Sequence, residues 1–274
     1  MLAAPVFADA DDPRGRAARL SYARSNVLLQ PSGESQWCQA LTNYVVTTGD
    51  RIYAGADSRA ELEIGSSVVR ISQATDLTVV NLSDRSLQVG LGQGSMRVTV
   101  FVLSPDNQVE IDTPNGSLTV LSPGSYRVDV DPAAGSTLVS VNSGSLQVNA
   151  TGAAQTVSSG VAVQLVGTAP VQVLSVPLPG KDDFDEWYAR RDQRIRVFAS
   201  ARYVNAYIPG VEDLDSYGRW EVAVDYGPVW YPADMPVVGC LTAMVIGCGW
   251  ILGGGLGSRM RRGVSARFIM AAGR

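Results

Sequence analysis

The side chains best suited to binding a ligand are aromatic and lie late in the chain. Tyr217, Trp220, Tyr226 and Trp230 recur among glycines and prolines over residues 217–232. Tyr and Trp each join a large apolar ring to one polar group, which suits a groove for a glycan or a peptide. The packed interior of a small irregular module would need the same residues. We name these four as candidate ligand-binding residues and keep both interpretations open.

The remaining candidates for chemistry are few. Glu212, Asp213 and Asp215 carry the oxygen ligands that calcium prefers. Their spacing matches no known calcium loop, so capping of turns is the simpler interpretation. Cys38 is the one cysteine outside the last 38 residues, which is too few for a disulfide framework within the chain. We predict no catalytic residue, no metal site and no cofactor.

The absence of histidine excludes several enzyme classes. With no His in 274 residues, Ser-His and Cys-His nucleophile pairs cannot be built. A His-containing zinc site is excluded as well, and no phosphate-binding loop stands in a strand-helix context. A hydrolase that uses two carboxylates remains open, because it needs only two acids facing each other in a cleft.

Most of the chain has the pattern of β-strands. From residue 17 to about 166, apolar and polar residues alternate in short runs separated by Gly, Asn, Asp and Pro. Such alternation places one face of each strand inward and the other toward water. The pattern predicts an all-β domain over 17–166, built as a β-roll, a short β-helix or a sandwich.

A weak repeat runs through this region. Four segments share the order Gly-Ser-apolar-polar-Val, and they begin at Gly94, Gly116, Gly124 and Gly144. Each glycine can take the positive φ of a tight turn before a strand begins. The spacings of 22, 8 and 20 residues exclude a regular solenoid. Glycines in the turns of ordinary β-hairpins would give the same pattern.

The order of several segments resembles the FecR domain. The resemblance rests on Thr47-Thr-Gly-Asp-Arg51, Ser58-Arg-Ala-Glu-Leu62, Gln93-Gly-Ser-Met-Arg97, Asp112-Thr-Pro114 and Ser122-Pro-Gly-Ser-Tyr-Arg-Val128. It covers roughly residues 17–166. At Ile64-Gly-Ser-Ser-Val68 the chain departs from the Asp-Gly or Gly-Gly turn that the family usually has.

A helix and an aromatic module are expected after a Pro/Gly linker at 167–181. Asp182–Arg196 has acids in its first turn and Arg later, which matches the helix dipole. Its apolar stripe of Phe184, Trp187, Tyr188, Arg191 and Ile195 predicts docking onto the β domain. The segment 182–236 resembles the Trp/Gly-rich C-terminal half of a subgroup of exported bacterial FecR-domain proteins.

Both ends of the sequence carry separate expectations. Ala8-Asp-Ala10 is a small-x-small pattern before an acidic stretch, so residues 1–16 resemble the end of a secretory signal peptide or a flexible terminus. Residues 1–236 hold all 26 acids and 17 of the 22 basic residues, a net charge of −9, whereas 237–274 hold five Arg and no acid. One interpretation of 237–258 is a membrane anchor, since it is uncharged and followed by arginines.

The other interpretation of 237–274 is a frameshift. Each Gly codon begins with GG, so a reading frame one base earlier turns the glycines of this segment into Trp, Arg or Gly. The permitted frame is aromatic, punctuated by Gly and Pro, and forces no stop. The shifted-frame sequence has the same aromatic, Gly- and Pro-rich composition as the preceding module. We therefore favour the frameshift over the membrane anchor.

The chain has no His, no nucleotide-binding loop and no metal cluster, and it joins a β domain to an aromatic, Gly-rich module. Together with the resemblance, this predicts a non-catalytic protein of the bacterial cell envelope that binds a protein or a glycan. Its location would be periplasmic or otherwise exported. The family name implies the alternative of transmembrane signalling through sigma-factor regulation. An acidic body gives no basis for nucleic-acid binding, and membrane association is expected only if 237–258 is an anchor.

Overall fold

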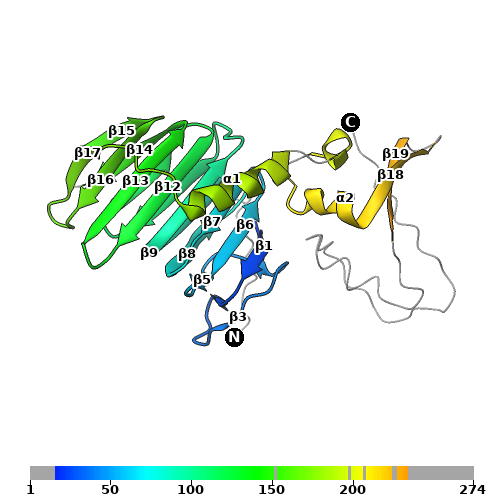
Figure 1. Ribbon diagram of the computed structural model, residues 1–274, viewed down its shortest axis with the longest axis horizontal. Helices are drawn as coiled ribbons and strands as arrows, with labels where there is room; N and C mark the ends of the chain where they lie inside the picture. The colour runs from blue at the N-terminus through cyan, green and yellow to red at the C-terminus, as the bar shows by residue number, and fades with distance from the viewer. Residues whose placement is uncertain (1–15, 151–152, 197–198, 206–207, 224–226, 234–274) are drawn as a thin grey trace, which may run out of the picture. The chain divides into compact units, whose positions relative to one another are not determined.

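The structure divides the chain into two compact units, Met1–Gly180 and Lys181–Arg274. This computed structural model describes residues 16–150, 153–196, 199–205, 208–223 and 227–233 (Figure 1). The predicted frameshifted tail, 237–274, lies outside the described residues, as does nearly all of the predicted signal remnant. Among the helices that are described, none has the length and apolar character needed to cross a bilayer.

The first unit consists of β-strands, which confirms the predicted all-β class. Seventeen strands lie within its described residues. They are β1 (Ala18–Arg24), β2 (Val27–Gln30), β3 (Cys38–Gln39), β4 (Val45–Val46), β5 (Arg51–Ala54), β6 (Arg59–Ile64), β7 (Ser67–Ile71), β8 (Thr75–Leu82), β9 (Ser86–Val100), β10 (Gln108–Thr113), β11 (Gly116–Val120), β12 (Gly124–Asp131), β13 (Ser136–Ser143), β14 (Ser145–Ala150), β15 (Ala153–Ser158), β16 (Val161–Val166) and β17 (Gln172–Val176).

The strands form two sheets of nine that share the long strand β9. The first sheet has the order β4-β1-β6-β7-β9-β12-β13-β16-β17 and is antiparallel throughout. The second sheet has the order β3-β2-β5-β8-β9-β10-β11-β14-β15, in which β9 and β10 pair in parallel. From β10 onward the chain forms hairpins alternately in the second and the first sheet, so both sheets lengthen in the same direction.

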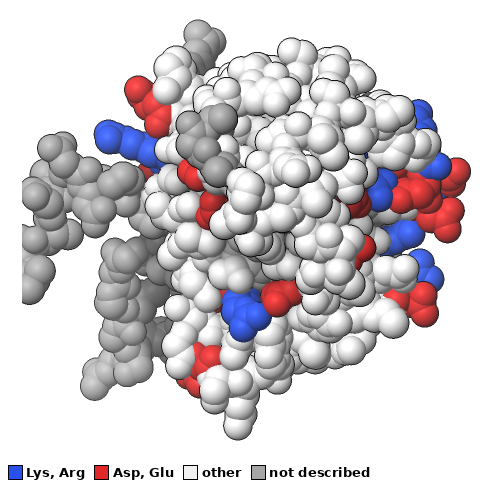
Figure 2. Space-filling model, turned by 90° about the vertical axis from the view of Figure 1, so that its left-hand side faces the viewer, with Lys and Arg blue, Asp and Glu red and all other residues white. Residues whose placement is uncertain are grey.

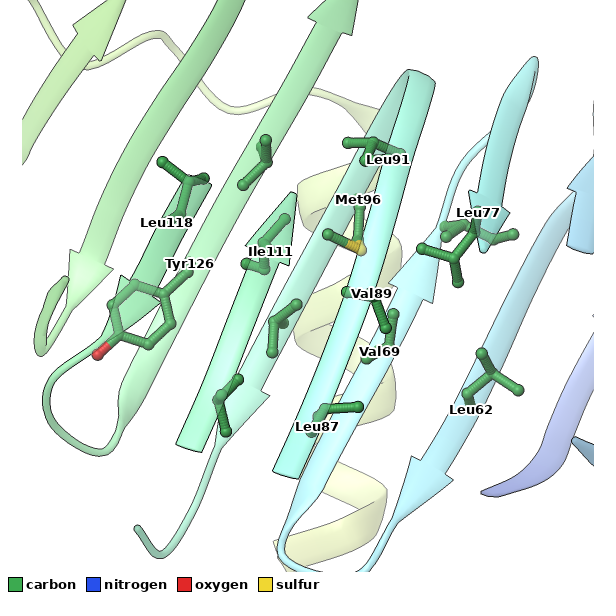
Figure 3. Packing of buried hydrophobic residues seen from close by; sticks show 14 of the residues in the cluster. Leu62, Val69, Leu77, Leu87, Val89, Leu91, Met96, Ile111, Leu118 and Tyr126 are labelled. Carbon is green, nitrogen blue, oxygen red and sulfur yellow. The ribbon is translucent and has the colours of Figure 1, made fainter. Parts of the chain in front are cut away.

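The facing sides of the two sheets enclose one apolar core. In many strands, such as β2, β8 and β14, alternation puts every second residue inside, as predicted, and the buried apolar residues form a single cluster. Figure 3 shows Leu62, Val69 and Met96 from strands of the first sheet close to Leu77 and Ile111 from the second. Burying one such side chain stabilises the fold by about 1.5–3 kcal/mol.

The Gly-Ser-apolar-polar-Val repeat has a definite place in this core. Its third residue is Met96, Leu118, Tyr126 or Leu146, and each of these is 0 % exposed. The four copies pair two by two: Met96 lies opposite Val128 in the first sheet, and Leu118 lies opposite Val148 in the second. The repeat therefore marks a pair of antiparallel strands in each sheet.

Tyr126 connects two of these copies. Its buried hydroxyl donates to the carbonyl oxygen of Ser122 at 2.5 Å and accepts from the backbone N–H of Ser145 at 3.2 Å. Burial raises the pKa of the Tyr126 hydroxyl above its ordinary value of 10.0, although its hydrogen bonds act in the opposite sense. Gly144 has φ +85°, and a Cβ there would collide with the Tyr126 hydroxyl. The glycine is required both by its backbone angle and by the ring that lies against it.

The segments that carry the FecR resemblance make turns and buried polar contacts. The carboxylate of Asp50, 5 % exposed, accepts from the backbone N–H groups of Ser32 at 2.8 Å and Thr47 at 2.7 Å. Gly49 has φ +89°, and Ser32 lies directly against it. The hydroxyl of Ser58, 0 % exposed, accepts from the backbone N–H of Asn26 at 3.0 Å. These residues hold the first hairpins in place.

The β structure continues into the range predicted as a linker. Strand β17 pairs with β16 from Ala162↔Val176 to Val166↔Gln172. Gly167, at φ +82°, donates its N–H to the carbonyl oxygen of Gly135 at 3.0 Å, so the chain turns back instead of leaving the sheet. Proline and glycine at 167–170 therefore form a hairpin turn, with the irregular linker beginning after Val176.

The second unit begins with the predicted helix, observed as α1 (Asp183–Arg196). Asp182 caps it: its carboxylate accepts from the N–H of Asp185 at 2.9 Å, and Asp185 returns a bond to the N–H of Asp182 at 3.3 Å. Phe184 and Trp187 are buried and stacked with ring centroids 5.9 Å apart. Docking of this stripe onto the β domain stays a prediction.

Short elements complete the second unit. They are η1 (Ala199–Arg202), η2 (Val211–Asp213), α2 (Leu214–Tyr217), β18 (Gly218–Ala223) and β19 (Gly227–Pro232). Strands β18 and β19 form an antiparallel hairpin of their own.

Candidate functional site

The two predicted tryptophans lie side by side in the small hairpin of the second unit. Trp220 in β18 stands opposite Trp230 in β19. The indole N–H of Trp220 donates to the Ser200 hydroxyl at 2.8 Å, and its ring stacks on Tyr203 at 4.7 Å. The indole N–H of Trp230 donates to the carbonyl oxygen of Leu214 at 3.1 Å. Both polar groups are thus used inside the unit.

The surroundings of the hairpin give these rings a packing role. A Cβ on Gly218 would collide with the Trp230 ring and with the carbonyl oxygen of Tyr231. Tyr217, in contrast, is 56 % exposed. Tyr226 lies outside the described residues. Of the four candidate residues, Tyr217 therefore offers a free surface, and the two tryptophans support the module.

Of the three acidic residues beside this module, Asp215 binds a different element of the same unit, whereas the Asp213 side chain makes no capping hydrogen bond at the start of α2. Asp215 accepts from the backbone N–H of Ser200 at 2.9 Å and also from the Ser200 hydroxyl. Within the part of the chain that the structure describes, Asp, Glu and Cys residues form no group able to hold a metal ion. Cys38 is exposed on the short strand β3.

An aromatic site that the sequence did not reveal lies on the outer face of the second sheet. We define the aromatic corner as Trp37, Arg51 and Tyr53. The Trp37 and Tyr53 rings meet edge to face with centroids 6.4 Å apart and planes at 73°. The Arg51 guanidinium carbon lies 5.4 Å from the centroid of the Trp37 ring, a cation–π contact.

The aromatic corner is held by polar partners from neighbouring strands. Arg51 donates to the Asp76 carboxylate at 2.9 Å and to the Gln30 side-chain oxygen at 3.4 Å. Trp37 is 37 % exposed, and the Arg51 side chain is 44 % exposed. The corner is thus pre-arranged, but its ring faces and its cation remain reachable from solvent.

A polar row continues from the aromatic corner across the sheet. The register places directly in line Arg51, Thr78, Gly90, Asp112, Ser117 and Asn149. These six residues, one on each of β5, β8, β9, β10, β11 and β14, span roughly 24 Å at the usual strand spacing. We call Thr78 to Asn149 the polar row.

The polar row consists of hydrogen-bonding side chains on either side of Gly90. Asp112 accepts from the Gln88 amide at 2.8 Å, and the Asn149 amide donates to the Thr119 hydroxyl at 3.3 Å. At Gly90 an added Cβ would meet its nearest side-chain atom at 3.6 Å, an ordinary contact distance. Amide, hydroxyl and carboxylate groups side by side can donate and accept at once, which suits a ligand rich in hydroxyl groups.

The outer face of the first sheet has a different character. Arg70, Arg97 and Arg127 lie directly opposite one another on β7, β9 and β12. Arg70 binds the Glu61 carboxylate at 2.6 Å with both side chains 0 % exposed, and Arg127 binds Asp129 at 3.0 Å. Like charges in this register repel, and the two carboxylates offset that repulsion. We assign this row a structural role.

A hollow at the edge of the first unit is too small for a substrate. It is lined by residues that include Arg16, Ser66 and Asp84, and its volume is about 20 Å³. Such a space holds about one water molecule. Arg16 lies 3.6 Å from Asp84 across its rim.

Part of the aromatic corner could be expected from the alternation along one strand. Alternation in Arg51-Ile-Tyr-Ala54 already places Arg51 and Tyr53 on the outward face. Trp37 comes from a polar loop 14 residues before Arg51, and pairing of β2 with both β3 and β5 brings it there. No local feature of the sequence indicates that these distant segments pair.

Comparisons with known proteins find solved structures that are similar to part of this chain, and two of them are described here. No family model matches the chain, and no curated protein matches it. The first structure is described as a "putative anti-sigma factor" from Parabacteroides distasonis; it is 13 % identical, with a TM-score of 0.42, over 47 % of this chain and 59 % of that one. A second structure of the same description is 12 % identical, with a TM-score of 0.43, over 67 % of this chain and 99 % of that one.

Proposed function

We propose that the chain is a non-catalytic binding protein and that the aromatic corner with its polar row takes a glycan. The observation that carries the proposal is the meeting of Trp37, Arg51 and Tyr53 at one end of a flat polar row. Aromatic rings supply an apolar face that can stack on the C–H face of a sugar. Amides, hydroxyls and carboxylates in line can exchange hydrogen bonds with successive hydroxyls.

The shape of this surface supports binding of an extended molecule. The line of residues from Arg51 to Asn149, about 24 Å long on a sheet face, would contact a chain along its length. A small-molecule site would instead be concave and would bury most of its ligand. The envelope location and the signalling alternative remain predictions from the sequence resemblance.

The test measures binding of the full chain to a glycan array and then, for each hit, the Kd by calorimetry. We expect Trp37→Ala and Tyr53→Ala each to weaken binding about tenfold or more, which equals about 1.4 kcal/mol. Tyr217→Ala is the control, since it removes an exposed aromatic ring from the other unit.

The outcome separates three interpretations. Loss of binding in Trp37→Ala with retention in Tyr217→Ala supports the aromatic corner. The reverse pattern places the site in the C-terminal module and overturns the proposal. Binding to no glycan, together with capture of one defined envelope protein that Trp37→Ala fails to capture, makes the ligand a protein.

A further inference from the structure

The charged residues of this chain avoid one end of the first unit. All 48 charged residues lie outside residues 132–180, a run of 49 residues with no Asp, Glu, Lys or Arg. This run forms β13 to β17, the last strands of both sheets. Figure 2 views the molecule from the side where β15 and β17 lie in Figure 1, and uncharged residues dominate the middle of that view, with most charges toward its margins.

At this uncharged end, each sheet finishes in an edge strand that pairs with a single neighbour among the described strands. Strand β17 ends the first sheet and pairs with β16, and strand β15 ends the second sheet and pairs with β14. They are five and six residues long. At the opposite end of the sheets, β3 and β4 are only two residues each.

Edge strands of this kind are normally protected. Proteins shorten them, or place charges, prolines or bulges in them, because an open edge pairs with other chains. The opposite end follows this rule by having very short strands. Neither β15 nor β17 contains a charge or a proline, and the pairings of both run without a register shift.

We propose that β17 pairs with β17 of a second copy of this chain, so that the first unit forms a symmetric dimer through its uncharged end. The sequence Gln172-Val-Leu-Ser-Val176 permits an antiparallel register centred on Leu174. Leu174 then faces its own copy, and Val173 faces Ser175. Pro170 and Pro177 flank the strand and limit the pairing to this segment.

A second copy suits this edge better than an unrelated partner for two reasons. The two-fold axis that relates antiparallel neighbours stands perpendicular to the sheet, so one axis can extend both sheets and can bring β15 beside its copy. Two acidic chains also meet with the least repulsion through a surface that has no charge. Leu174 is 46 % exposed and Val161 of β16 is 40 % exposed, which leaves apolar surface to bury.

The first test compares the molar mass of the full chain with that of two variants by analytical ultracentrifugation over about 1–100 µM. We expect the wild type to dimerise and Leu174→Lys to raise the dimer dissociation constant at least tenfold, because it places two like charges directly opposite. Leu41→Lys is the matched control: Leu41 is 62 % exposed and belongs to the opposite end. It should dimerise as the wild type does.

The second test locates the contact. With Cys38, Cys240 and Cys248 replaced by Ser, Leu174→Cys should form a covalent dimer on mild oxidation, since opposed residues in an antiparallel pair lie within disulfide range. Val222→Cys, at a residue 77 % exposed in the second unit, should not. A wild-type chain that is monomeric throughout the range overturns the proposal. Dissociation by Leu41→Lys also overturns it, because it would show head-to-tail association instead.

Discussion

Replacing Tyr126 by Phe removes one buried hydroxyl and leaves the ring in the core. The hydroxyl joins the carbonyl oxygen of Ser122 to the N–H of Ser145, in the turns that precede β12 and β14. The Ser145 N–H keeps a second acceptor, the Ser122 hydroxyl at 2.9 Å, whereas the Ser122 carbonyl loses this donor. The loss of a buried hydrogen bond of this kind costs about 1–2 kcal/mol.

This loss should appear as a lower midpoint of unfolding. For a domain of this size, 1 kcal/mol shifts the midpoint by about 2–4 °C, so we expect a decrease of roughly 2–8 °C at neutral pH. The measurement is urea and thermal unfolding followed by far-UV circular dichroism. Tyr44→Phe is the control, because Tyr44 is 39 % exposed and its change should leave the midpoint within about 1 °C.

The difference in stability between the wild type and Tyr126→Phe should depend on pH. The folded-state pKa of Tyr126 is raised above 10.0, so the native state holds this proton more tightly than the unfolded state does. The stability that follows from the shift is fully present below pH 10 and is lost as pH rises through the folded-state pKa. In that window wild-type stability should fall by about 1.4 kcal/mol per pH unit relative to Tyr126→Phe.

Two results would refute this reasoning. One is equal stability of wild type and Tyr126→Phe at pH 8. The other is a stability difference that stays constant between pH 9 and pH 11, since the remaining tyrosines occur in both proteins and cancel.

Two other polar contacts make further predictions. Asp50→Ala removes the acceptor of the Ser32 and Thr47 N–H groups and should cost about 2–3 kcal/mol in urea unfolding, whereas Asp50→Asn keeps one acceptor oxygen and should fall between it and wild type; equal losses in the two variants would contradict the role of the carboxylate. Glu61→Gln breaks the buried pair with Arg70 and should destabilise by about 3–5 kcal/mol. The exposed pair of Arg219 and Glu221 is its control: Glu221→Gln should cost less than about 1 kcal/mol, and a similar cost in both variants would show that burial of the first pair is unimportant.

Local patterns were sufficient to predict the class of the fold but not its topology. Alternation and turn residues placed the strands, and the acidic start of Asp182–Arg196 placed the helix. Which strands pair depends on contacts between distant residues, such as Arg19 with Glu63 and Leu118 with Val148. Alternation along one strand carries no information on its neighbour, so the winding of hairpins between two sheets could not be predicted.

The candidate site was harder to predict because composition does not distinguish an exposed aromatic ring from a packed one. Trp220 and Trp230 stand in a Gly-rich segment that could serve either purpose. In the structure their N–H groups bind Ser200 and Leu214. Trp37 gave no pattern at all in the sequence, and it becomes a site residue only where β5 brings Arg51 and Tyr53 beside it.

Three buried residues of the segments that carry the family resemblance are informative about architecture and not about the ligand. Asp50, Ser58 and Tyr126 are buried and bind backbone groups of neighbouring turns. A protein could keep these three residues and bind a different partner, because none of the three reaches the outer face of the second sheet. That face holds Trp37 and Tyr53, which lie outside the segments that carry the resemblance, together with Arg51 and Asp112, which lie within them. Under the proposed function, substitutions of Trp37 and Tyr53 should therefore change binding without loss of folding, whereas substitutions of Asp50, Ser58 and Tyr126 should act on both.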